Sequence, residues 1–508
     1  MSIDLLPAEP RLDIHTLGTR LTRAELARAG YVSIVVPQNP SRAVWRALPD
    51  AAQLARALRD APDGSVVPAV ATRLANSSRT PVGITTYKGG ESTFERLSFA
   101  RKLIAHAIAA GAKQFSLLMP GIAAEARRQI GEAVVAAALA AVYPAPTLKR
   151  EPAVTPRLRA LYLHDPGDSL PIDRLRAEAA GNGLARWLGV LPPNTLTMSS
   201  YRARVDALAR RHKWELDFLD ERALAKRNAG AFLAVAQGNA TRDAGIVHLR
   251  YRPRGASTRP QVALVGKGIC FDTGGTNLKT ARGMQHMHED MLGSAVALGT
   301  LLALTRLRAP FSVDCWLAIT ENRLSPSAYK PQDVVTASNG TTIEVVHTDA
   351  EGRMALADTL ALASGEKPGI VIDYATLTGA CVNAVTERYS GAFTNRSALE
   401  PVLVRAGRTS GERVWPFPLD SDFDEPLESH IADIKQCVIE NEGDHILAAR
   451  FLSRFVGDDT PWIHIDLASA RKKGGLGHVP TDVTGFGVRY SLALLLDERL
   501  AQDGHGRR

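Results

Sequence analysis

PQVALVGKGICFDTGG (residues 260–275) combines an apolar run with a glycine-rich ending. The apolar run predicts a buried strand, and Gly274 and Gly275 predict a tight turn directly after it. Two charged residues, Lys267 and Asp272, nevertheless lie within this segment. In parallel sheets that are covered on both faces, such polar residues gather where strands end and loops begin.

Further segments repeat the pattern of an apolar strand followed by a loop. They are SVDCWLAIT (312–320), GIVIDYATLTGA (369–380) and WIHIDLAS (462–469). Between them lie two stretches with helical character, residues 293–307 and 353–364. Strands that alternate with helices predict an α/β fold with a mostly parallel central sheet flanked by helices.

The beginning of the chain predicts a separate, smaller α/β domain. YVSIVVP (31–37) is a β-branched run typical of a strand, and residues 94–120 read as a helix, a stop at Gly111 and a strand. Residues 131–143 form an alanine-rich helical pattern, after which prolines become frequent. We therefore predict a small N-terminal domain at 1–160, a linker at 161–180 and a larger C-terminal domain at 181–508.

Length and composition agree with two ordinary globular domains. The chain has 508 residues, of which 45% are hydrophobic and 22% charged. Its net charge of +8 suits anionic partners such as nucleic acid, although a solvated, arginine-rich surface explains this charge as well and is the interpretation we favour. The four cysteines include no C-x-x-C pair, so neither a disulfide framework nor a cysteine zinc site is indicated. No signal peptide or membrane span is visible, so a cytoplasmic protein is expected.

Charged residues occur at three places where predicted strands end or helices begin. The groups are Lys267 and Asp272 with Lys279, then Asp290, and finally Asp349, Glu351 and Arg353 in HTDAEGR (347–353). Four carboxylates brought together repel one another unless cations lie between them. Oxygen-rich sites with few histidines suit Mg²⁺, Mn²⁺ or Zn²⁺. Four carboxylates suffice for two ions, which lie about 3.5–4 Å apart in such sites and activate water while polarising a carbonyl.

Each of these residues also has an ordinary structural explanation. Asp290 alone would be a helix N-cap, and Lys267 alone would be a surface lysine. Arg353 in the first turn of a helix could pair with Glu351. The hypothesis of a metal site therefore depends on all of these residues meeting at one edge of the sheet.

The combination of motifs resembles the cytosolic leucyl aminopeptidase family, the dinuclear metallopeptidases of family M17. It consists of VGKGICFDTGGTNLK (265–279), Asp290, HTDAEGRMALADTL (347–360) and ATLTGA (375–380), supported by LPPNTLT (191–197) and TGFGVR (484–489). The match covers about 180 to 490, whereas the first 150 residues match only in general character. His347 departs from the family pattern, which has asparagine there.

The resemblance implies a role for each matching residue. One ion would be held by Lys267, Asp272, Asp290 and Glu351, and the other by Asp272, Asp349 with its backbone carbonyl, and Glu351. Lysine binds metal only as a neutral amine, and burial and adjacent cations both lower its pKa. Lys279 would stabilise the developing oxyanion, and Arg353 would hold a bicarbonate ion that moves a proton. The residues expected to contact substrate are Met287, Thr376, Leu377, Thr378 and Gly379.

The function implied by the resemblance is removal of the N-terminal residue, leucine or another residue, from peptides. The expected cofactors are two divalent ions, Zn²⁺ or Mn²⁺ with Mg²⁺ as an alternative, together with bicarbonate. Related proteins form hexamers, so a homo-hexamer is expected. Some family members also bind DNA, but Arg and Lys are scattered here, so nucleic-acid binding is an alternative that we do not favour.

Overall fold

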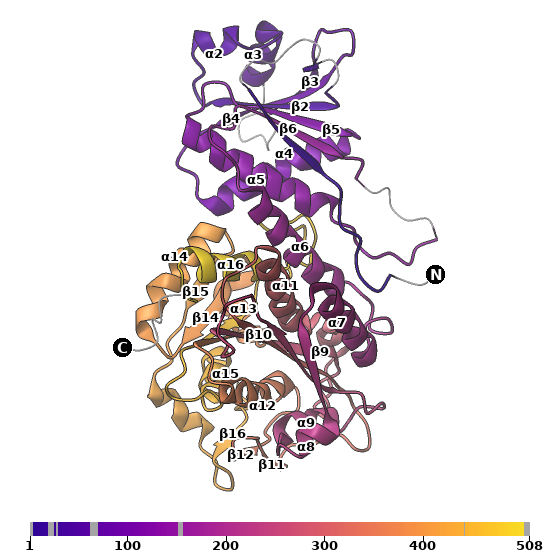
Figure 1. Ribbon diagram of the computed structural model, residues 1–508, viewed down its shortest axis with the longest axis vertical. Coiled ribbons are helices and arrows are strands. Elements are labelled where there is room, and N and C mark those ends of the chain that lie inside the picture. Colours follow the sequence, from indigo (N-terminus) through magenta and orange to yellow (C-terminus); the bar gives the residue numbers. More distant parts are fainter. Residues whose placement is uncertain are drawn as a thin grey trace. The chain divides into compact units, whose positions relative to one another are not determined.

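The structure is a computed structural model that describes residues 4–18, 25–26, 29–60, 70–150, 156–440 and 442–501. The chain divides into two compact units. The N-terminal unit contains Ala8–Ala179 and the short segment Gly474–Asp482, and the C-terminal unit contains Ala180–Lys473 together with the chain after Asp482 (Figure 1). Each unit has its own central sheet.

The N-terminal unit is built on a six-stranded sheet in the order β1-β6-β5-β2-β4-β3. Its strands are β1 (Asp13–Leu17), β2 (Tyr31–Pro37), β3 (Val70–Arg73), β4 (Pro81–Tyr87), β5 (Gln114–Leu118) and β6 (Ala160–His164). All neighbours are parallel except β3 and β4. Its helices are α2 (Arg42–Arg46), α3 (Ala51–Arg59), α4 (Thr93–Ala109) and α5 (Ala124–Val142).

Helices cover both faces of this sheet because successive residues of a strand point to opposite sides. Val35 of β2 packs in one apolar cluster with Leu103 of α4 and Val134 of α5. Its neighbour Ile34 packs in a second cluster with Leu54 of α3. The β-branched run at 31–37 is therefore buried on both faces, as expected for an inner parallel strand.

The C-terminal unit contains an eight-stranded sheet in the order β15-β14-β17-β13-β9-β10-β8-β7. Its strands are β7 (Glu215–Asp220), β8 (Gly245–Tyr251), β9 (Val262–Asp272), β10 (Val313–Asn322), β13 (Ile370–Ala375), β14 (Ser390–Thr394), β15 (Val414–Pro416) and β17 (Trp462–Asp466). The four central strands β17, β13, β9 and β10 are parallel. β14 pairs with β17, and β8 with β10 and β7, in antiparallel fashion.

Two long helices pack on opposite faces of the central strands (Figure 1). α11 (Leu292–Arg306) approaches so closely that a Cβ on Gly266 of β9 would lie 2.4 Å from the Cα of Ser294. The next residue, Lys267, points to the other face, where it meets Gly352 of α12 (Glu351–Gly365). The glycine at 266 thus lets α11 pack tightly while Lys267 remains available to the site.

The remaining elements surround this core. The helices are α6 (Ile172–Gly189), α7 (Met198–His212), α8 (Glu221–Ala225), α9 (Gly230–Ala236), α10 (Ala281–Met284), α13 (Gly379–Val385), α14 (Glu400–Ser410), α15 (Asp444–Ser453) and α16 (Val488–Leu492). The shorter turns are η1 (Met287–Glu289), η2 (Thr386–Arg388), η3 (Ser397–Leu399), η4 (Ser421–Leu427) and η5 (Ala493–Asp497). A small third sheet contains β11 (Val334–Thr336), β12 (Thr342–Glu344) and β16 (Ile434–Lys435).

The predicted fold class, an α/β protein with a mostly parallel central sheet, is confirmed. The segment 161–180, predicted as a linker, requires a correction. It contains most of β6 and the beginning of α6, and α6 continues from the N-terminal unit into the C-terminal unit at Ala180. The strand was missed because it is short and pairs with β1, whose residues lie far away in the sequence.

Candidate active site

The four central strands of the C-terminal unit end at one edge of the sheet, and a polar residue occupies each end. β9 ends at Asp272, β10 at Asn322 and β17 at Asp466, while β13 ends at Ala375 directly before Thr376. The strand register pairs Asp272 with Asn322 and Ala375 with Asp466. The carboxyl edge of this sheet therefore brings together side chains from distant parts of the chain.

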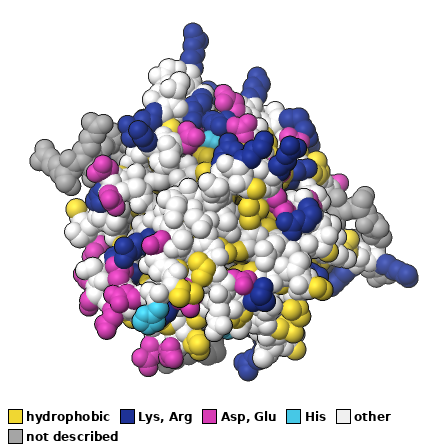
Figure 2. Space-filling model, turned by 90° about the horizontal axis from the view of Figure 1, so that it is seen from below, with side chains coloured by type: hydrophobic (Ala, Val, Ile, Leu, Met, Phe, Trp, Pro, Cys, Tyr) yellow, Lys and Arg dark blue, Asp and Glu magenta, His cyan; other side chains and the backbone are white. Residues whose placement is uncertain are grey.

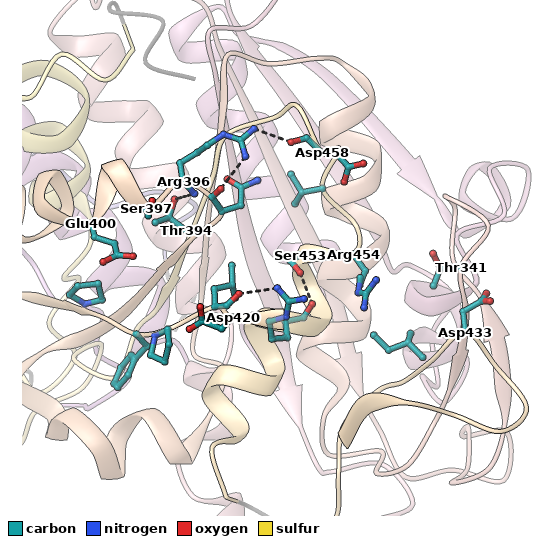
Figure 3. A pocket seen from close by; sticks show the side chains of 18 residues that line it. Thr341, Thr394, Arg396, Ser397, Glu400, Asp420, Asp433, Ser453, Arg454 and Asp458 are labelled. Atoms are coloured by element: carbon teal, nitrogen blue, oxygen red, sulfur yellow. Dashed lines mark hydrogen bonds between the residues drawn. The ribbon is translucent and has the colours of Figure 1, made fainter. Parts of the chain in front are cut away.

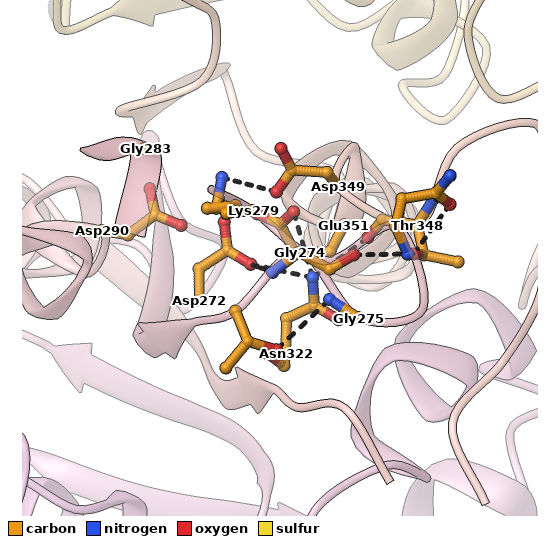
Figure 4. A network of polar contacts seen from close by, with 12 residues as sticks. Asp272, Gly274, Gly275, Lys279, Gly283, Asp290, Asn322, Thr348, Asp349 and Glu351 are labelled. Carbon is orange, nitrogen blue, oxygen red and sulfur yellow. Dashed lines mark hydrogen bonds and ion pairs between the residues drawn. The ribbon is translucent and has the colours of Figure 1, made fainter. Parts of the chain in front are cut away.

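Three more carboxylates reach this edge from loops and a helix start. Asp290 follows η1, Asp349 lies in the loop before α12, and Glu351 is the first residue of α12 (Figure 4). The N-cap position of α11 is Met291, so Asp290 does not cap that helix. Its Oδ1 instead accepts a hydrogen bond of 2.8 Å from the Thr376 hydroxyl.

Two lysines lie among these carboxylates. The Nζ of Lys267 is 2.9 Å from Asp290 and 3.0 Å from Glu351. The Nζ of Lys279 is 2.8 Å from Asp272 and 2.5 Å from Asp349. Each lysine thus pairs with two different carboxylates, and four carboxylates share two ammonium groups.

The pKa values reflect this shortage of positive charge. Burial alone would lower the pKa of Lys267, but Asp290, Glu351 and Asp272 outweigh burial and raise it. The pKa of Lys279 is raised in the same way. Burial, together with Glu351 and Asp272, raises the pKa of Asp349 to about 7. Burial also raises the pKa of Asp290 well above its ordinary value, despite the nearby Lys267.

The donor set fits a divalent metal ion. Asp272, Asp290 and Glu351 can each offer an oxygen, and these oxygens all lie within 4.8 Å of one another. All three residues are buried, and the Oδ2 atom of Asp290 has no hydrogen-bond partner among the described residues. Buried carboxylates are costly unless a cation compensates them, and carboxylate oxygens with one amine suit zinc or manganese. A bound metal ion would compensate the excess negative charge of the carboxylates and would coordinate the unpartnered Oδ2 atom of Asp290.

A glycine-rich turn and an asparagine hold the ligands in place. After β9 the chain turns through Gly274 with a φ of +88°, and the Gly274 N–H donates to Asp272 Oδ1 at 2.8 Å. Residues with a side chain rarely adopt this backbone conformation, so glycine is required here. Asn322, at the end of β10, donates to Asp272 Oδ1 at 2.8 Å and to the Thr348 carbonyl at 3.0 Å. Asn322 was not predicted to belong to the site.

Arg353 pairs with a residue that the sequence patterns did not indicate. Arg353 is 2% exposed, and its guanidinium donates to Asp444 Oδ1 at 2.7 Å and to the Gln436 carbonyl at 3.2 Å. Arg353 therefore forms its ion pair with Asp444 and not with Glu351, the structural alternative considered from the sequence. Asp444 is the first residue of α15.

His347, which departs from the family pattern, lies beside the site. Its Nδ1 accepts a hydrogen bond of 3.2 Å from the backbone N–H of Asp349. Burial and Lys279 lower the pKa of this imidazole, while Glu351 and Asp444 oppose them. A ring that accepts this bond at Nδ1 fixes the loop that carries Asp349.

A pocket of about 380 Å³ opens onto the carboxylates and lysines. All five residues predicted to contact substrate line it: Met287, Thr376, Leu377, Thr378 and Gly379. Asp466 lines it as well, accepting hydrogen bonds from the Leu377 N–H at 3.1 Å and the Thr378 hydroxyl at 2.7 Å. Burial raises the pKa of Asp466. Asp466 was also missed by the sequence patterns, although it ends a segment recognised as a strand.

A larger pocket of about 1060 Å³ lies elsewhere on the C-terminal unit (Figure 3). Its arginines have local partners: Arg396 donates to the Asp458 carbonyl at 2.9 Å, and Arg450 pairs with Asp424 at 2.6 Å. Within the described chain, the one group of three or more His, Cys, Asp or Glu residues with converging ligand atoms is Asp272, Asp290 and Glu351. The smaller pocket is therefore the better candidate for metal chemistry.

Comparison with known proteins gives a family match to the C-terminal unit. The model of the cytosol aminopeptidase family, catalytic domain, matches residues 183–492. A probable cytosol aminopeptidase of Parasynechococcus marenigrum (strain WH8102) is 44% identical over 317 residues, which are 62% of this chain and 64% of that protein. One from Prochlorococcus marinus (strain MIT 9313) is 41% identical over 343 residues, 67% of this chain and 69% of that protein.

Solved structures resemble the chain over nearly its whole length. A mutant of tomato leucine aminopeptidase has a TM-score of 0.83 at 25% identity, covering 97% of this chain and 98% of that chain. The bottromycin maturation enzyme BotP in complex with Mn has a TM-score of 0.76 at 30% identity, covering 93% of this chain and 100% of that chain. Because the family model spans more than half of the chain, the chain belongs to the cytosol aminopeptidase family, M17, a family of metal-dependent peptidases.

Proposed function

We propose that this protein is a metalloaminopeptidase that hydrolyses the N-terminal residue, leucine or one of a broader range, from peptides. The observation that carries the proposal is the pocket in which Asp272, Asp290 and Glu351 converge beside two lysines. Family membership supports the same reaction. The substrate's first residue would occupy the part of the pocket lined by Met287 and Thr376–Gly379.

Two divalent ions are part of the proposal. Lys267, Asp272, Asp290 and Glu351 would hold one ion, and Asp272, Asp349 and Glu351 would hold the other. Bound ions would polarise the scissile carbonyl and activate a water molecule. Manganese is supported by BotP, whose structure was solved with Mn, and zinc and magnesium also bind carboxylate oxygens. Bicarbonate on Arg353 remains a prediction from the family resemblance.

The chain's own residues would orient the peptide and stabilise charge. Lys279 lines the pocket between Asp272 and Asp349, and its ammonium group would donate to the carbonyl oxygen as negative charge develops. Asp466 holds the Leu377 N–H and the Thr378 hydroxyl, which fixes the segment along which the substrate would lie. The free α-amine of the substrate would ligate one of the two ions, which would restrict cleavage to the N-terminal residue.

Metal analysis and a substrate panel test this proposal. Protein purified without chelator should contain two divalent ions per chain and should hydrolyse aminoacyl amides whose α-amine is free. N-acetylated versions of the same amides serve as the matched control and should not be cleaved. Protein that carries stoichiometric metal but hydrolyses none of the free aminoacyl amides would contradict the proposal.

The remaining expectations concern partners and location. A homo-hexamer is expected, and several large apolar side chains of the C-terminal unit are exposed, including Trp415, Ile431 and Ile439. A sedimenting mass near the 54.6 kDa of one chain would count against this assembly. None of the described helices combines the length and hydrophobicity needed to cross a bilayer. The relatives are named cytosol aminopeptidases, which supports a cytoplasmic location.

DNA binding stays an alternative prediction supported by the pI of about 9.3. On the face of the molecule shown in Figure 2, lysines and arginines occur together with aspartates and glutamates and do not form one continuous basic surface. Retention of the protein on DNA that weakens steeply with salt would support this alternative. Variants that lose peptidase activity while keeping such retention would separate the two functions.

A further inference from the structure

We propose that Arg471, which is paired with Glu289, selects peptides whose first residue is acidic, aspartate or glutamate, in preference to leucine. The inference rests on the proposed aminopeptidase function and names the substrate class of the same pocket. Both residues line the pocket that opens onto the carboxylates and lysines, and they form an ion pair there. Neither belongs to the groups of charged residues that the sequence patterns indicated.

The ion pair lies beside the place proposed for the first residue of the substrate. Glu289 belongs to the same short turn as Met287, η1, and directly precedes Asp290. The Asp290 carboxylate accepts a hydrogen bond of 2.8 Å from the Thr376 hydroxyl, so this turn meets the segment 376–379 at the pocket. The α-carbon of the substrate's first residue bears both the amine that would ligate an ion and the side chain. That side chain would therefore begin close to Asp290 and extend along the wall that contains Glu289.

The backbone holds Arg471 at the pocket wall. Arg471 follows β17, and Ala468 and Ala470, which precede it, line the same pocket. The Ala470 carbonyl accepts a hydrogen bond of 2.9 Å from the Thr484 N–H, and Arg471 forms an antiparallel backbone bridge with Val483. The loop after Arg471 is thereby closed at its base, and the arginine side chain starts from a fixed point.

Arg471 is the accessible member of the pair, and Glu289 is the enclosed one. The side chain of Arg471 is 32% exposed, whereas that of Glu289 is 9% exposed. The Glu289 carboxylate also lies 3.6 Å from Nδ1 of His286, at the start of the same turn. A guanidinium carries several N–H donors in a planar fork and can bind a second carboxylate while it keeps the first. The pocket therefore offers a cation to the side chain of the substrate.

The other classes of first residue fit this wall less well. A leucine side chain packed against Arg471 would displace water from the ion pair without replacing its hydrogen bonds, which costs free energy. A basic side chain would need an available carboxylate, but Glu289 is enclosed, and Glu387, which also lines the pocket, pairs with Lys472 at 2.8 Å. An acidic side chain would instead gain charged hydrogen bonds from Arg471.

The ion pair also has a purely structural explanation. It connects the chain after β17 to η1, and on this explanation it would only maintain the shape of the pocket. Loss of the pair would then weaken all substrates by the same factor. Recognition of charge predicts a different result, because it changes the ratio of kcat/KM between acidic and apolar first residues.

Kinetics of the metal-loaded protein provide the first test, with L-glutamyl and L-leucyl amides of the same amine as substrates. The wild type should have the higher kcat/KM for the glutamyl amide. Arg471→Leu should lower that value by about 10–100-fold, the usual cost of a lost charged hydrogen bond, without lowering the value for the leucyl amide. Arg471→Lys keeps the charge and should keep the preference. Arg405→Leu is the control, because it removes an arginine that pairs with Glu498 at 2.9 Å outside this pocket, and it should leave the ratio unchanged.

The possible outcomes separate this inference from the proposed function. A wild type that favours leucyl or lysyl amides would overturn the inference, and so would an Arg471→Leu variant that loses the same factor on both substrates. A metal-loaded wild type that hydrolyses none of these amides would instead mean that the proposed function itself fails.

Calorimetric titration with the free amino acids provides a second test, which does not depend on turnover. The metal-loaded wild type should bind L-glutamate more tightly than L-leucine, and Arg471→Leu should reverse this order. Because Arg471→Leu leaves the enclosed Glu289 without its arginine, the double variant Glu289→Gln/Arg471→Leu is measured as well and should show the same reversal. A wild type that binds glutamate no better than leucine, or a double variant that still prefers glutamate, would contradict the inference.

Discussion

The two lysines of the site differ in what surrounds them. The Lys267 side chain is 4% exposed and contacts Asp290, Glu351 and the Thr376 carbonyl. The Lys279 side chain is 15% exposed and lines the pocket between Asp272 and Asp349. An enclosed amine among carboxylates suits a ligand, whereas a partly open ammonium group suits a contact with substrate.

Replacement of Lys279 tests whether Lys267 binds metal while Lys279 contacts the substrate. Lys279→Ala should lower kcat by about 10²–10³-fold, the usual loss when one oxyanion donor is removed, while the metal content measured by mass spectrometry stays at the wild-type value. Lys330→Ala is the control, because Lys330 is 66% exposed and pairs only with Asp333 among the described residues. A Lys279→Ala protein that loses its metal would show that Lys279 holds the ions.

Gly352 allows Lys267 to reach the carboxylates. A Cβ at this position would lie 2.5 Å from Cε and 2.6 Å from Nζ of Lys267, so Gly352→Ala must displace the amine. Displacement should weaken metal binding by about 10–100-fold, comparable to other losses around metal ligands, as measured by titration of chelated protein. Gly365→Ala, in the same helix with no atom within 4 Å, should bind metal like the wild type. Equal affinities for the two variants would contradict this explanation.

The sequence predicted the residues of the site that lie close together along the chain. Asp349, Glu351 and Arg353 fall in one motif, and Lys267 and Asp272 in another, so the motifs together with the predicted strand ends indicated metal chemistry. Asn322 and Asp466 were missed although each lies at or just after the end of a segment that reads as a strand, because neither belongs to a charged motif. They join the site only through pairing of β10 and β17 with neighbouring strands. The partner of Arg353 was missed for the same reason, since α15 begins 91 residues later.

At the scale of elements, the central parallel strands were predictable because each is buried on both faces. The predicted strand at 462–469 contains β17. The predicted strand at 31–37 coincides with β2 at both ends. The shorter strands at the sheet edges and in the third sheet were not expected. β15 and β16 contain three and two residues, too few to show any periodicity, and only their partners define them as strands.

The packing of α11 against the sheet is a second prediction at this scale. A Cβ on Gly293 would lie 2.2 Å from the Tyr374 carbonyl oxygen, which is backbone and cannot move aside without shifting β13. Gly293→Ala should therefore destabilise the protein by about 1–3 kcal/mol, measured by urea unfolding. It should also lower metal content, because Asp290 lies just before α11. Gly283→Ala, whose nearest neighbour would be 3.4 Å away, should unfold like the wild type.

At the scale of the whole molecule, the site belongs to one unit only. Every residue that lines the pocket falls within the C-terminal unit, between Lys267 and Arg471. The N-terminal unit has its own sheet and its own two apolar clusters. Ligands stabilise what they bind, so metal ions should affect the two units differently.

Metal removal tests this separation. Without ions, Lys267 and Lys279 still pair with all four carboxylates, so chelated protein should remain folded but inactive, with a lower Tm than the loaded protein. Hydrogen exchange should quicken in β9, α11 and α12, whose residues carry or flank the ligands, and should not change in β2 and β5 of the N-terminal unit. Activity should return when Mn²⁺ or Zn²⁺ is added back. Equal acceleration of exchange in β2 and in β9 would show that the ions stabilise the molecule as one cooperative body, and the proposed independence of the two units would then be wrong.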